Sequence, residues 1–237
     1  SGLVFHPVGQ TVLYHIGAGD TARSFGNPIQ LMLGHEAENG RKVLNVWYDK
    51  TAGGQYGLAI HRASLFEAIY HTVQRRDVTI HTQSRITAAS AGTFQLDDGA
   101  AHGPFDLIIA ATGAGSPISP LKSTPLPYGA IWGTVDWPET DLPTQNLSQC
   151  YRRADRMIGV LPIGKMPGDP KLKAAIFWSM PRDSHTAWVG DGVQAWKDAA
   201  VALWPAFAPF AAQIDTPEQM TMARYAHGTL RRPWSPG

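Results

Sequence analysis

The chain has 237 residues, 43% of them hydrophobic, so it can form one or two domains with buried cores. The formal net charge of +1 gives no electrostatic reason to expect binding to nucleic acid or to an anionic membrane surface. The longest apolar runs are far shorter than the roughly 20 residues that cross a bilayer, so no membrane span is predicted.

The first candidate motif, Gly17-Ala18-Gly19-Asp20-Thr21-Ala22, matches the G-x-G-x-x-A pattern of a dinucleotide-binding turn. Such a turn follows a strand and opens a helix long enough to cross a sheet. Here Val12, Leu13 and Ile16 precede the motif at helical spacing. Gly26-Asn27-Pro28 then ends the segment soon afterwards. The pattern therefore indicates a turn between two helices.

A β-hairpin comes next. Strands at 29–33 and 41–48 are predicted around Asn39-Gly40, a strong turn signal. A glycine-rich loop at 51–57 leads to a short strand at 58–60.

A helix is predicted directly after that strand. Ser64 is placed to cap it, and Glu67, three residues on, completes a capping box. Apolar residues at helical spacing predict the buried stripe of this helix, which is Leu65, Phe66, Ile69, Tyr70 and Val73.

Short strands at 78–81, 84–88 and 93–96 precede the most informative segment, which runs from Asp106 to Ser116. Its five apolar residues, 107–111, do not alternate with polar ones, which indicates a strand buried on both faces, as in a parallel sheet. Two glycines follow, and glycine lets the backbone turn sharply beside a ligand. Such a turn is expected at the carboxyl edge of an α/β sheet, where ligands bind.

The composition changes after Ser116. Four prolines mark a linker into another domain, namely Pro117, Pro120, Pro125 and Pro127. Strands are then predicted at 130–135, 157–161, 172–180 and 219–226. A helix face is formed by Val193, Trp196, Ala200, Leu203 and Trp204. This region is expected to be an antiparallel sheet with a helix packed on it.

The order and spacing of several motifs resemble those of the FAD-dependent aromatic hydroxylases, the flavoprotein monooxygenases of the p-hydroxybenzoate hydroxylase type. Asp106 to Ser116 resembles the middle motif of that family, with Thr112 where the family usually has Asp. Residues 57–65 resemble its strand-to-helix segment, and residues 2–13 resemble the segment near the flavin. Residues 128–132 and 159–164 resemble strands of its substrate domain.

The resemblance implies an α/β fold of mixed α+β character. A partial FAD-binding Rossmann-like domain, at 1–28 and 58–122, would interleave with an antiparallel β-sheet substrate domain at 29–57 and 123–237. The hairpin at 29–48 is expected to join the substrate sheet. The family's N-terminal GxGxxG motif and C-terminal Gly-Asp motif do not occur here. The chain is therefore expected to be an internal fragment that binds FAD weakly or not at all by itself.

The resemblance also implies cofactor-binding residues. Arg62 is expected to contact FAD near its pyrophosphate, because a helix N-terminus favours an anion and a guanidinium adds bidentate phosphate recognition. The alternative is a surface arginine paired with a carboxylate. Thr112 and Gly113 are expected beside the ribityl chain, or else to form a plain tight turn. Gly2 and Leu3 are expected to be backbone neighbours of the isoalloxazine ring.

Trp132 and Phe177 are candidates to line a pocket for an aromatic substrate, the alternative being ordinary core packing. The nine histidines show no metal-ligand spacing, so no metal site is expected. His6 and His61, near the expected cofactor, are interpreted as satisfied or solvated. The single cysteine, Cys150, excludes an internal disulfide, suits a reducing cytoplasm and is interpreted as a buried filler.

The function implied by the resemblance is monooxygenation. NAD(P)H would reduce FAD, and one oxygen atom of O2 would be inserted into a small, usually aromatic substrate. Because the cofactor carries this chemistry, no catalytic side chain is assigned. The alternatives are another flavin oxidoreductase on the same fold, of reductase or halogenase type, and a non-catalytic fragment or degenerate paralogue.

Overall fold

The computed structural model describes residues 1–50, 54–113 and 115–232. Its contacts divide the chain into two units. The first unit comprises residues 1–77 and 127–223, and the second comprises residues 78–126 together with those from 224 onward. The predicted loop at 51–57 and the glycine turn at 113–115 lie partly outside the described residues.

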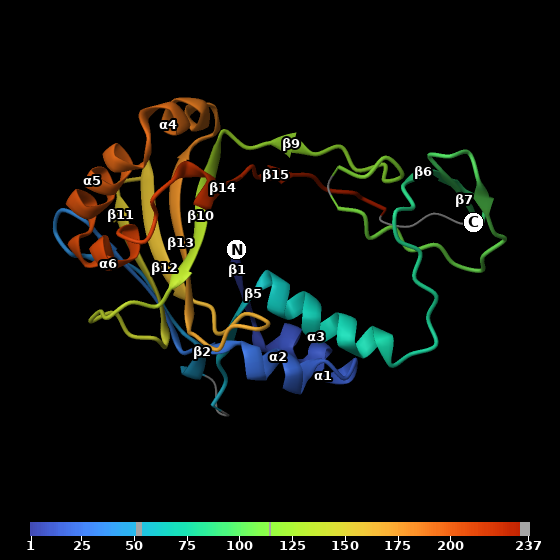
Figure 1. Cartoon of the computed structure of the whole chain (residues 1–237), viewed down its shortest axis with the longest axis horizontal. Helices are drawn as coiled ribbons and strands as arrows, with labels where there is room; N and C mark the ends of the chain where they lie inside the picture. Colours follow the sequence, from blue (N-terminus) through green and yellow to red (C-terminus); the bar gives the residue numbers. More distant parts are fainter. Residues whose placement is uncertain (51–53, 114, 233–237) are drawn as a thin grey trace. The chain divides into compact units, whose positions relative to one another are not determined.

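The first unit contains a seven-stranded sheet with the strand order β14-β10-β13-β12-β11-β3-β4 (Figure 1). Its strands in chain order are β3 (Leu31–Glu36), β4 (Lys42–Trp47), β10 (Tyr128–Asp136), β11 (Asn146–Arg152), β12 (Arg156–Pro162), β13 (Lys173–Pro181) and β14 (Met220–Ala223). The strands expected at 130–135, 157–161 and 172–180 are thus confirmed. The strand β11 was not predicted from the sequence.

The hairpin of β3 and β4 joins this sheet, as expected. The strand β3 pairs in parallel with β11, from Leu31 opposite Asn146 to Glu36 opposite Tyr151. Every other pair in the sheet is antiparallel. Gly40 takes a positive φ of 69° in the turn between β3 and β4, which is the conformation that the predicted Asn-Gly signal requires.

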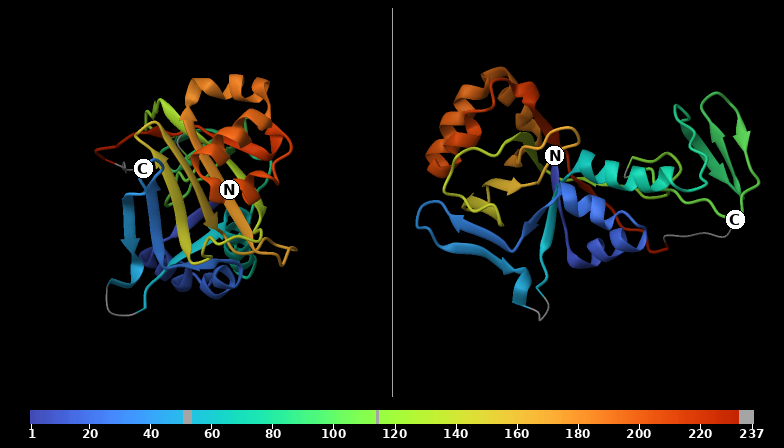
Figure 2. Two further views of the ribbon diagram at one scale, coloured as in Figure 1. Left: turned by 90° about the vertical axis from the view of Figure 1, so that its left-hand side faces the viewer. Right: turned by 60° about the horizontal axis from the view of Figure 1, so that its bottom comes forward.

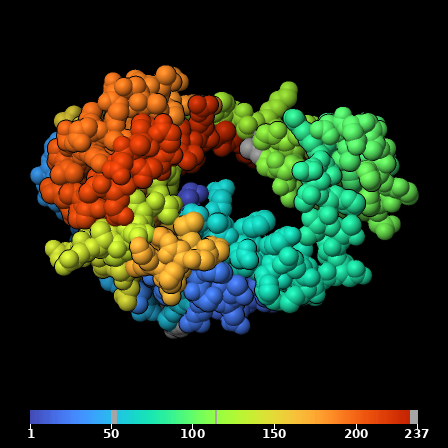
Figure 3. Space-filling view, viewed as in Figure 1, coloured from blue at the N-terminus to red at the C-terminus, as the bar shows by residue number. Residues whose placement is uncertain are grey.

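Three helices cover one face of the large sheet, called here the helix face (Figure 2). They are α4 (His185–Asp191), α5 (Val193–Leu203) and α6 (Ala208–Ala211). Figure 3 shows their side chains as a continuous orange and red layer. Alternate strand residues such as Ile131, Ile158 and Ile176 bury against Trp196 and Phe210 of these helices. The predicted helix around Trp196 is therefore confirmed as α5, and Cys150 is buried in the same cluster.

The other side of the large sheet, the small-sheet face, carries Trp132, Gln149, Leu161, Ala175 and Phe177. It packs in part against a three-stranded sheet with the order β1-β5-β2. The strands of this small sheet are β1 (Gly2–Phe5), β2 (Asn27–Ile29) and β5 (Gly57–His61). The expected strand at 58–60 is confirmed as part of β5.

Three further helices cover the small sheet: α1 (Pro7–His15), α2 (Gly19–Phe25) and α3 (Arg62–Gln74). The G-x-G-x-x-A motif lies at the predicted turn between α1 and α2, with Gly17 at a φ of 83° in the turn and residues 19–22 in the first part of α2. None of the helices in the described part of the chain is long and apolar enough to cross a bilayer.

The predicted cap of α3 is wrong. The helix begins at Arg62, with His61 as its N-cap, so Ser64 stands at the third helical position. The hydroxyl of Ser64 is buried and donates to the carbonyl of Lys165 at 2.7 Å. Because the strand β5 passes directly into the helix at Arg62, the N-cap is His61, and Ser64 already lies within the first turn.

The predicted stripe of α3 is partly wrong as well. The buried positions are Ser64, Ala68 and Thr72, whose small side chains allow close packing. Leu65 and Ile69 pack at the margin of the same cluster. Phe66 is 62% exposed and stacks on Tyr70 at a centroid distance of 5.4 Å.

The second unit holds a three-stranded sheet and a two-stranded ladder. Their strands are β6 (Ile86–Ser90), β7 (Thr93–Leu96) and β8 (Ala101–His102), and β9 (Thr124–Pro125) with β15 (Ala226–His227). The strands β6 and β7 confirm two predicted strands. The single closing strand predicted at 219–226 is instead split between β14 of the first unit and β15.

The two other strands predicted in the second unit are absent. Residues 78–81 and 107–111 have no strand structure, and Leu107 and Ile109 are 75% and 78% exposed. A buried parallel strand needs hydrogen-bonded neighbours on both sides. No described strand pairs with residues 107–111. The prediction of a buried strand there is therefore wrong for this structure, although the residue pattern is typical of one.

Candidate functional site

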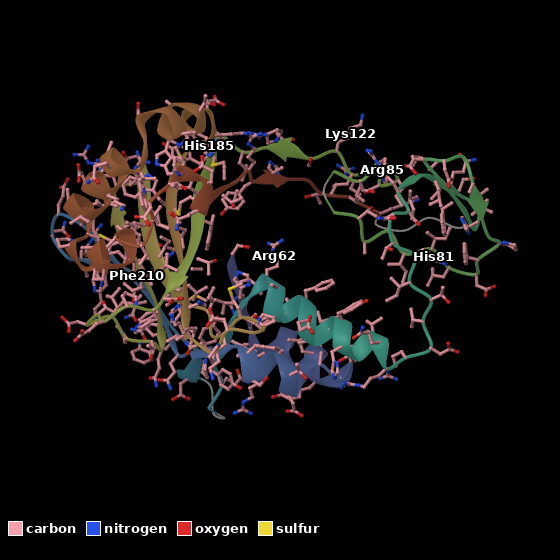
Figure 4. The ribbon with its side chains drawn as sticks, in the orientation of Figure 1. Arg62, His81, Arg85, Lys122, His185 and Phe210 are labelled. Atoms are coloured by element: carbon pink, nitrogen blue, oxygen red, sulfur yellow. The ribbon has the colours of Figure 1, made fainter. Side chains whose placement is uncertain are left out.

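Arg62 is the first residue of α3 and directly follows β5 (Figure 4). Its backbone N–H donates to the carbonyl of Ser1 at 3.0 Å. The side chain is exposed, and no carboxylate among the described residues forms an ion pair with it. The alternative interpretation, a structural surface ion pair, thus finds no partner in the part of the chain that the structure describes. The guanidinium is available for an anion beside the start of the helix.

His61 caps α3. Its Nδ1 accepts from the N–H of Ala63 at 3.1 Å, and its Nε2 lies 3.3 Å from the amino group of Ser1. Burial, and then the positive charge of that amino group, lower the pKa of His61 to about 4. His61 is therefore neutral near pH 7. His6 also has a partner, since its Nδ1 lies 2.9 Å from the hydroxyl of Tyr48. Both histidines are satisfied, as expected.

Gly2 and Leu3 lie in β1, beside Arg62. Gly2 is opposite His61 and Leu3 is opposite Ile60 in the pairing of β1 with β5. A Cβ on Gly2 would lie 2.3 Å from Cγ2 of Ile163 and 3.0 Å from Cβ of Ala175, so a side chain would clash there. The strand β1 therefore contacts the small-sheet face closely, and it brings Gly2, Leu3 and Arg62 together within the first unit.

Trp132 and Phe177 lie on the same small-sheet face. They are directly opposite each other in β10 and β13, and their rings are 4.5 Å apart with an angle of 30° between them. Ala175, which Gly2 contacts, precedes Phe177 by two residues on the same face. The predicted substrate residues and the predicted residues of β1 therefore occupy neighbouring positions.

Thr112 and Gly113 lie in the second unit. The hydroxyl of Thr112 donates to Oγ of Ser116, and Gly113 has a φ of 80°. The rest of the expected turn includes position 114, which lies outside the described residues. The relation of this turn to Arg62 is not fixed, because the turn and Arg62 belong to different units. A shared role of Thr112, Gly113 and Arg62 in cofactor binding stays a prediction.

A polar pair on the small-sheet face was missed by the sequence analysis. The hydroxyl of Tyr151 donates to Oε1 of Gln149 at 2.7 Å, and Gln149 is only 9% exposed. Both residues belong to β11. Because β11 was not recognised as a strand, nothing in the sequence pointed to these side chains as neighbours of Phe177.

Open hollows on the first unit lie elsewhere. One of about 610 Å³ is lined by Glu38 and residues 152–155 at the tip of the hairpin between β11 and β12. Arg152 and Asp155 already form an ion pair of 2.7 Å there. Another of about 490 Å³ is a shallow groove between α5 and α6. None of the predicted site residues lines either hollow, so neither is a candidate active site. Among the described residues no group of histidine, cysteine and carboxylate side chains could hold a metal ion.

Comparison with solved structures shows what this arrangement resembles. The fold matches 2-methyl-3-hydroxypyridine-5-carboxylic acid oxygenase over 98% of this chain, with 19% identity and a TM-score of 0.77. It matches PqsL of Pseudomonas aeruginosa, a probable FAD-dependent monooxygenase, over 99% of this chain, with 15% identity and a TM-score of 0.80. It also matches HpxO of Klebsiella pneumoniae complexed with FAD over 96% of this chain, with 18% identity and a TM-score of 0.74.

At 15–19% identity these matches establish the fold, which the chain shares with these three proteins over nearly its whole length. The mixed α/β fold expected from the sequence is thereby confirmed. The chain spans 60–66% of the length of these neighbours. No protein-family model and no curated protein sequence matches the chain.

Proposed function

We propose that this chain forms part of an FAD-dependent monooxygenase that hydroxylates a small aromatic substrate with NAD(P)H and O2. The observation that carries the proposal is the end-to-end likeness to monooxygenase structures, which extends over 96–99% of the chain. The activity is assigned to the whole protein, because the chain spans less than two thirds of the length of each of these neighbours.

The residues around β1 and the start of α3 fit a flavin nucleotide. Arg62 offers an exposed guanidinium for the pyrophosphate. Gly2 and Leu3 are proposed to lie with their backbone beside the ring. When bound, FAD supplies the redox chemistry and the activation of oxygen. Thr112 and Gly113 are proposed to approach the ribityl chain, where Thr112 can form one hydrogen bond but supplies no charge.

The substrate is proposed to bind at the small-sheet face. Trp132 is partly exposed close to β1 and packs on the buried ring of Phe177, and both are proposed to line the substrate pocket. The apolar cluster around Leu161 and Ala175 keeps water from that region. The structures of PqsL include a complex with 2-aminobenzoylacetate, a small aromatic compound. We also propose a cytoplasmic location, which the single buried Cys150 favours.

The test uses the whole protein. It should copurify with FAD, oxidise NADH or NADPH and yield a hydroxylated product from an aromatic substrate. Oxidation of NAD(P)H without any hydroxylated product would favour a reductase. A whole protein without flavin, and without affinity for added FAD, would refute the proposal.

Arg62→Ala in that protein tests the cofactor site. Loss of one charge-assisted hydrogen bond should weaken FAD binding about tenfold. Arg76→Ala, at the other end of α3, serves as the matched control and should leave the affinity unchanged. Equal affinities for all three proteins would remove Arg62 from the cofactor site.

A further inference from the structure

The connection between β12 and β13 reaches the start of α3 (Figure 1). It comprises residues 163–172 and is called here the β12–β13 loop. The hydroxyl of Ser64, in the first turn of α3, donates to the carbonyl of Lys165 in this loop at 2.7 Å. The backbone N–H of Lys165 donates in turn to the carbonyl of Phe25, the last residue of α2, at 2.7 Å. One residue of the loop is therefore bonded to two helices of the small-sheet layer.

The loop can approach α2 this closely only because it carries a glycine. Gly164 has a φ of 73°, and a Cβ there would lie 1.9 Å from the carbonyl oxygen of Phe25. The carbonyl of Gly164 accepts from the N–H of Lys173 at 2.8 Å, and the carbonyl of Lys173 accepts from the N–H of Ile163 at 2.8 Å. Two backbone hydrogen bonds thus close the base of the loop, next to the carbonyl that Ser64 meets.

An ion cluster holds the far part of the loop to the large sheet. The ammonium group of Lys173, in β13, contacts the carboxylates of Asp136 in β10 and of Asp169 in the loop. The backbone N–H of Lys171 donates to Oδ1 of Asp169 at 3.0 Å. Lys173 is only 8% exposed, so loss of either carboxylate would leave a buried charge with one partner fewer. The acceptor of the Ser64 hydroxyl is therefore part of a loop that is fixed to the large sheet at both ends.

The hydrogen bond of Ser64 links distant parts of the chain. A serine inside a helix usually donates back to a carbonyl of the preceding turn. Ser64 donates instead to a residue 101 positions away. Because Ser64 is fully buried, no water can replace that acceptor if the bond is lost. The bond therefore ties the first turn of α3 to the large sheet.

Arg62 belongs to the same helical turn, two residues before Ser64. Its backbone N–H donates to the carbonyl of Ser1 at 3.0 Å. Its guanidinium has no carboxylate partner in the part of the chain that the structure describes, so no ion pair orients it. The place from which this side chain extends is thus set by the backbone of the first turn, which Ser1 holds on one side and Lys165 on the other.

We infer that Ser64 is a positioning residue for the binding of the FAD diphosphate by Arg62. Its hydrogen bond to Lys165 fixes the first turn of α3 relative to β13, the strand that carries Phe177. Ser64 is buried, so it acts through Arg62 and not by contact with the cofactor. The inference rests on the proposed function, because it takes Arg62 as the residue that meets the diphosphate.

The test is a double-mutant cycle on the FAD affinity of the whole protein, measured by quenching of flavin fluorescence in the apoprotein. Ser64→Ala should weaken FAD binding about threefold, because the guanidinium is then held less well for its charge-assisted bonds. In a protein that already carries Arg62→Ala, the same change should alter the affinity by less than about 1.5-fold. A purely structural role of Ser64 would weaken binding by the same factor in both backgrounds.

Thr72→Val is the matched control. Thr72 is also a buried residue of α3, and its hydroxyl lies 3.2 Å from the carbonyl of Gly17 and 3.1 Å from that of Ala68. It lies eight residues beyond Ser64, about 12 Å along the helix. Loss of its hydroxyl should lower the Tm and leave the FAD affinity unchanged.

A second substitution at the same position keeps the test decisive if Ser64→Ala does not fold. Ser64→Cys retains a side chain of similar size whose thiol is a weak donor. It should weaken FAD binding less than Ser64→Ala does, and again only in the presence of Arg62. Circular dichroism checks the fold of each variant.

Unchanged FAD affinity in the folded Ser64 variants would overturn the inference. So would equal weakening with and without Arg62, or a loss of affinity in Thr72→Val as large as that in Ser64→Ala. A whole protein that binds no FAD would refute the proposed function and the inference together. A protein that binds FAD but shows strictly additive effects would keep the function and lose the inference alone.

Discussion

The contact between Gly159 and Phe177 gives a prediction that depends on geometry alone. In Gly159→Ala the new methyl group would lie 2.1 Å from Cζ, 2.6 Å from Cε2 and 2.8 Å from Cε1 of the Phe177 ring. No pair of carbon atoms tolerates such distances, so the ring must move. Phe177 is only 3% exposed and packs on Trp132, so any movement of its ring removes buried contacts.

Overpacking of this kind costs about 1–3 kcal/mol, and we expect a decrease of about 2 kcal/mol in the free energy of unfolding. For a domain of this size that corresponds to a decrease in Tm of roughly 4–8 °C. Thermal unfolding followed by circular dichroism measures the change. Adding Phe177→Leu removes the ring above Gly159, so the double variant should be more stable than the sum of the single effects predicts, by about 1 kcal/mol or more.

Gly190→Ala provides the matched control. Gly190 lies in α4, and its Cβ would meet nothing within 4 Å. Alanine there should stabilise the protein by about 0.5–1 kcal/mol. A neutral or stabilising Gly159→Ala, or strictly additive effects in the double variant, would show that Phe177 does not lie above Gly159.

Three other predictions follow from features of the two units. Because the pKa of His61 falls from 6.5 to about 4 on folding, the free energy of unfolding should decrease as the pH falls from 6.5 towards 4. His61→Asn, which keeps a capping side chain, should flatten that decrease in denaturant titrations; an unchanged slope would contradict it. Gly164→Ala should cost about 3 kcal/mol or more, because its φ is 73° and its Cβ would lie 1.9 Å from the carbonyl oxygen of Phe25. Gly168→Ala, with a φ of 77° and open surroundings, should cost only about 1 kcal/mol in the same assay, and equal costs would refute the clash. Ile109→Lys should change the stability of this chain by less than about 0.5 kcal/mol, since Ile109 is exposed, and a larger loss in chemical denaturation would indicate burial.

Local signals in the sequence predicted much of the first unit. The Asn39-Gly40 turn and the helical spacing of the apolar residues in α5 each express a local preference that agrees with the surrounding structure. The strand β11 was missed because its buried positions include Ser148 and Gln149, which carry no hydrophobic signal. Residues 107–111 show the opposite failure. Their composition indicates a strand, but a strand also needs neighbouring strands to pair with. The five residues themselves do not show whether such neighbours are present.

The candidate site shows the same limit. The identity of Arg62, Trp132 and Phe177 as candidates followed from sequence and resemblance. That Trp132 faces Phe177, and that Gly2 touches Ala175, depends on pairings between segments more than 40 residues apart. No sequence motif marks Gln149 and Tyr151. Gln149 becomes a neighbour of Phe177 only through the pairing of β11 with β12 and of β12 with β13.

The parallel pairing of β3 with β11 joins segments that are more than 100 residues apart in the chain. A shortened chain that begins after β4 would carry β11 with one unpaired edge, and one that stops before β11 would leave the hairpin without its neighbour. Either truncation would expose a strand edge that can pair with other chains, so a piece that keeps the large sheet whole has to run from β3 to β14. Recombination between homologous genes would bring β3 and β11 from different parents together whenever the crossover falls between these two strands.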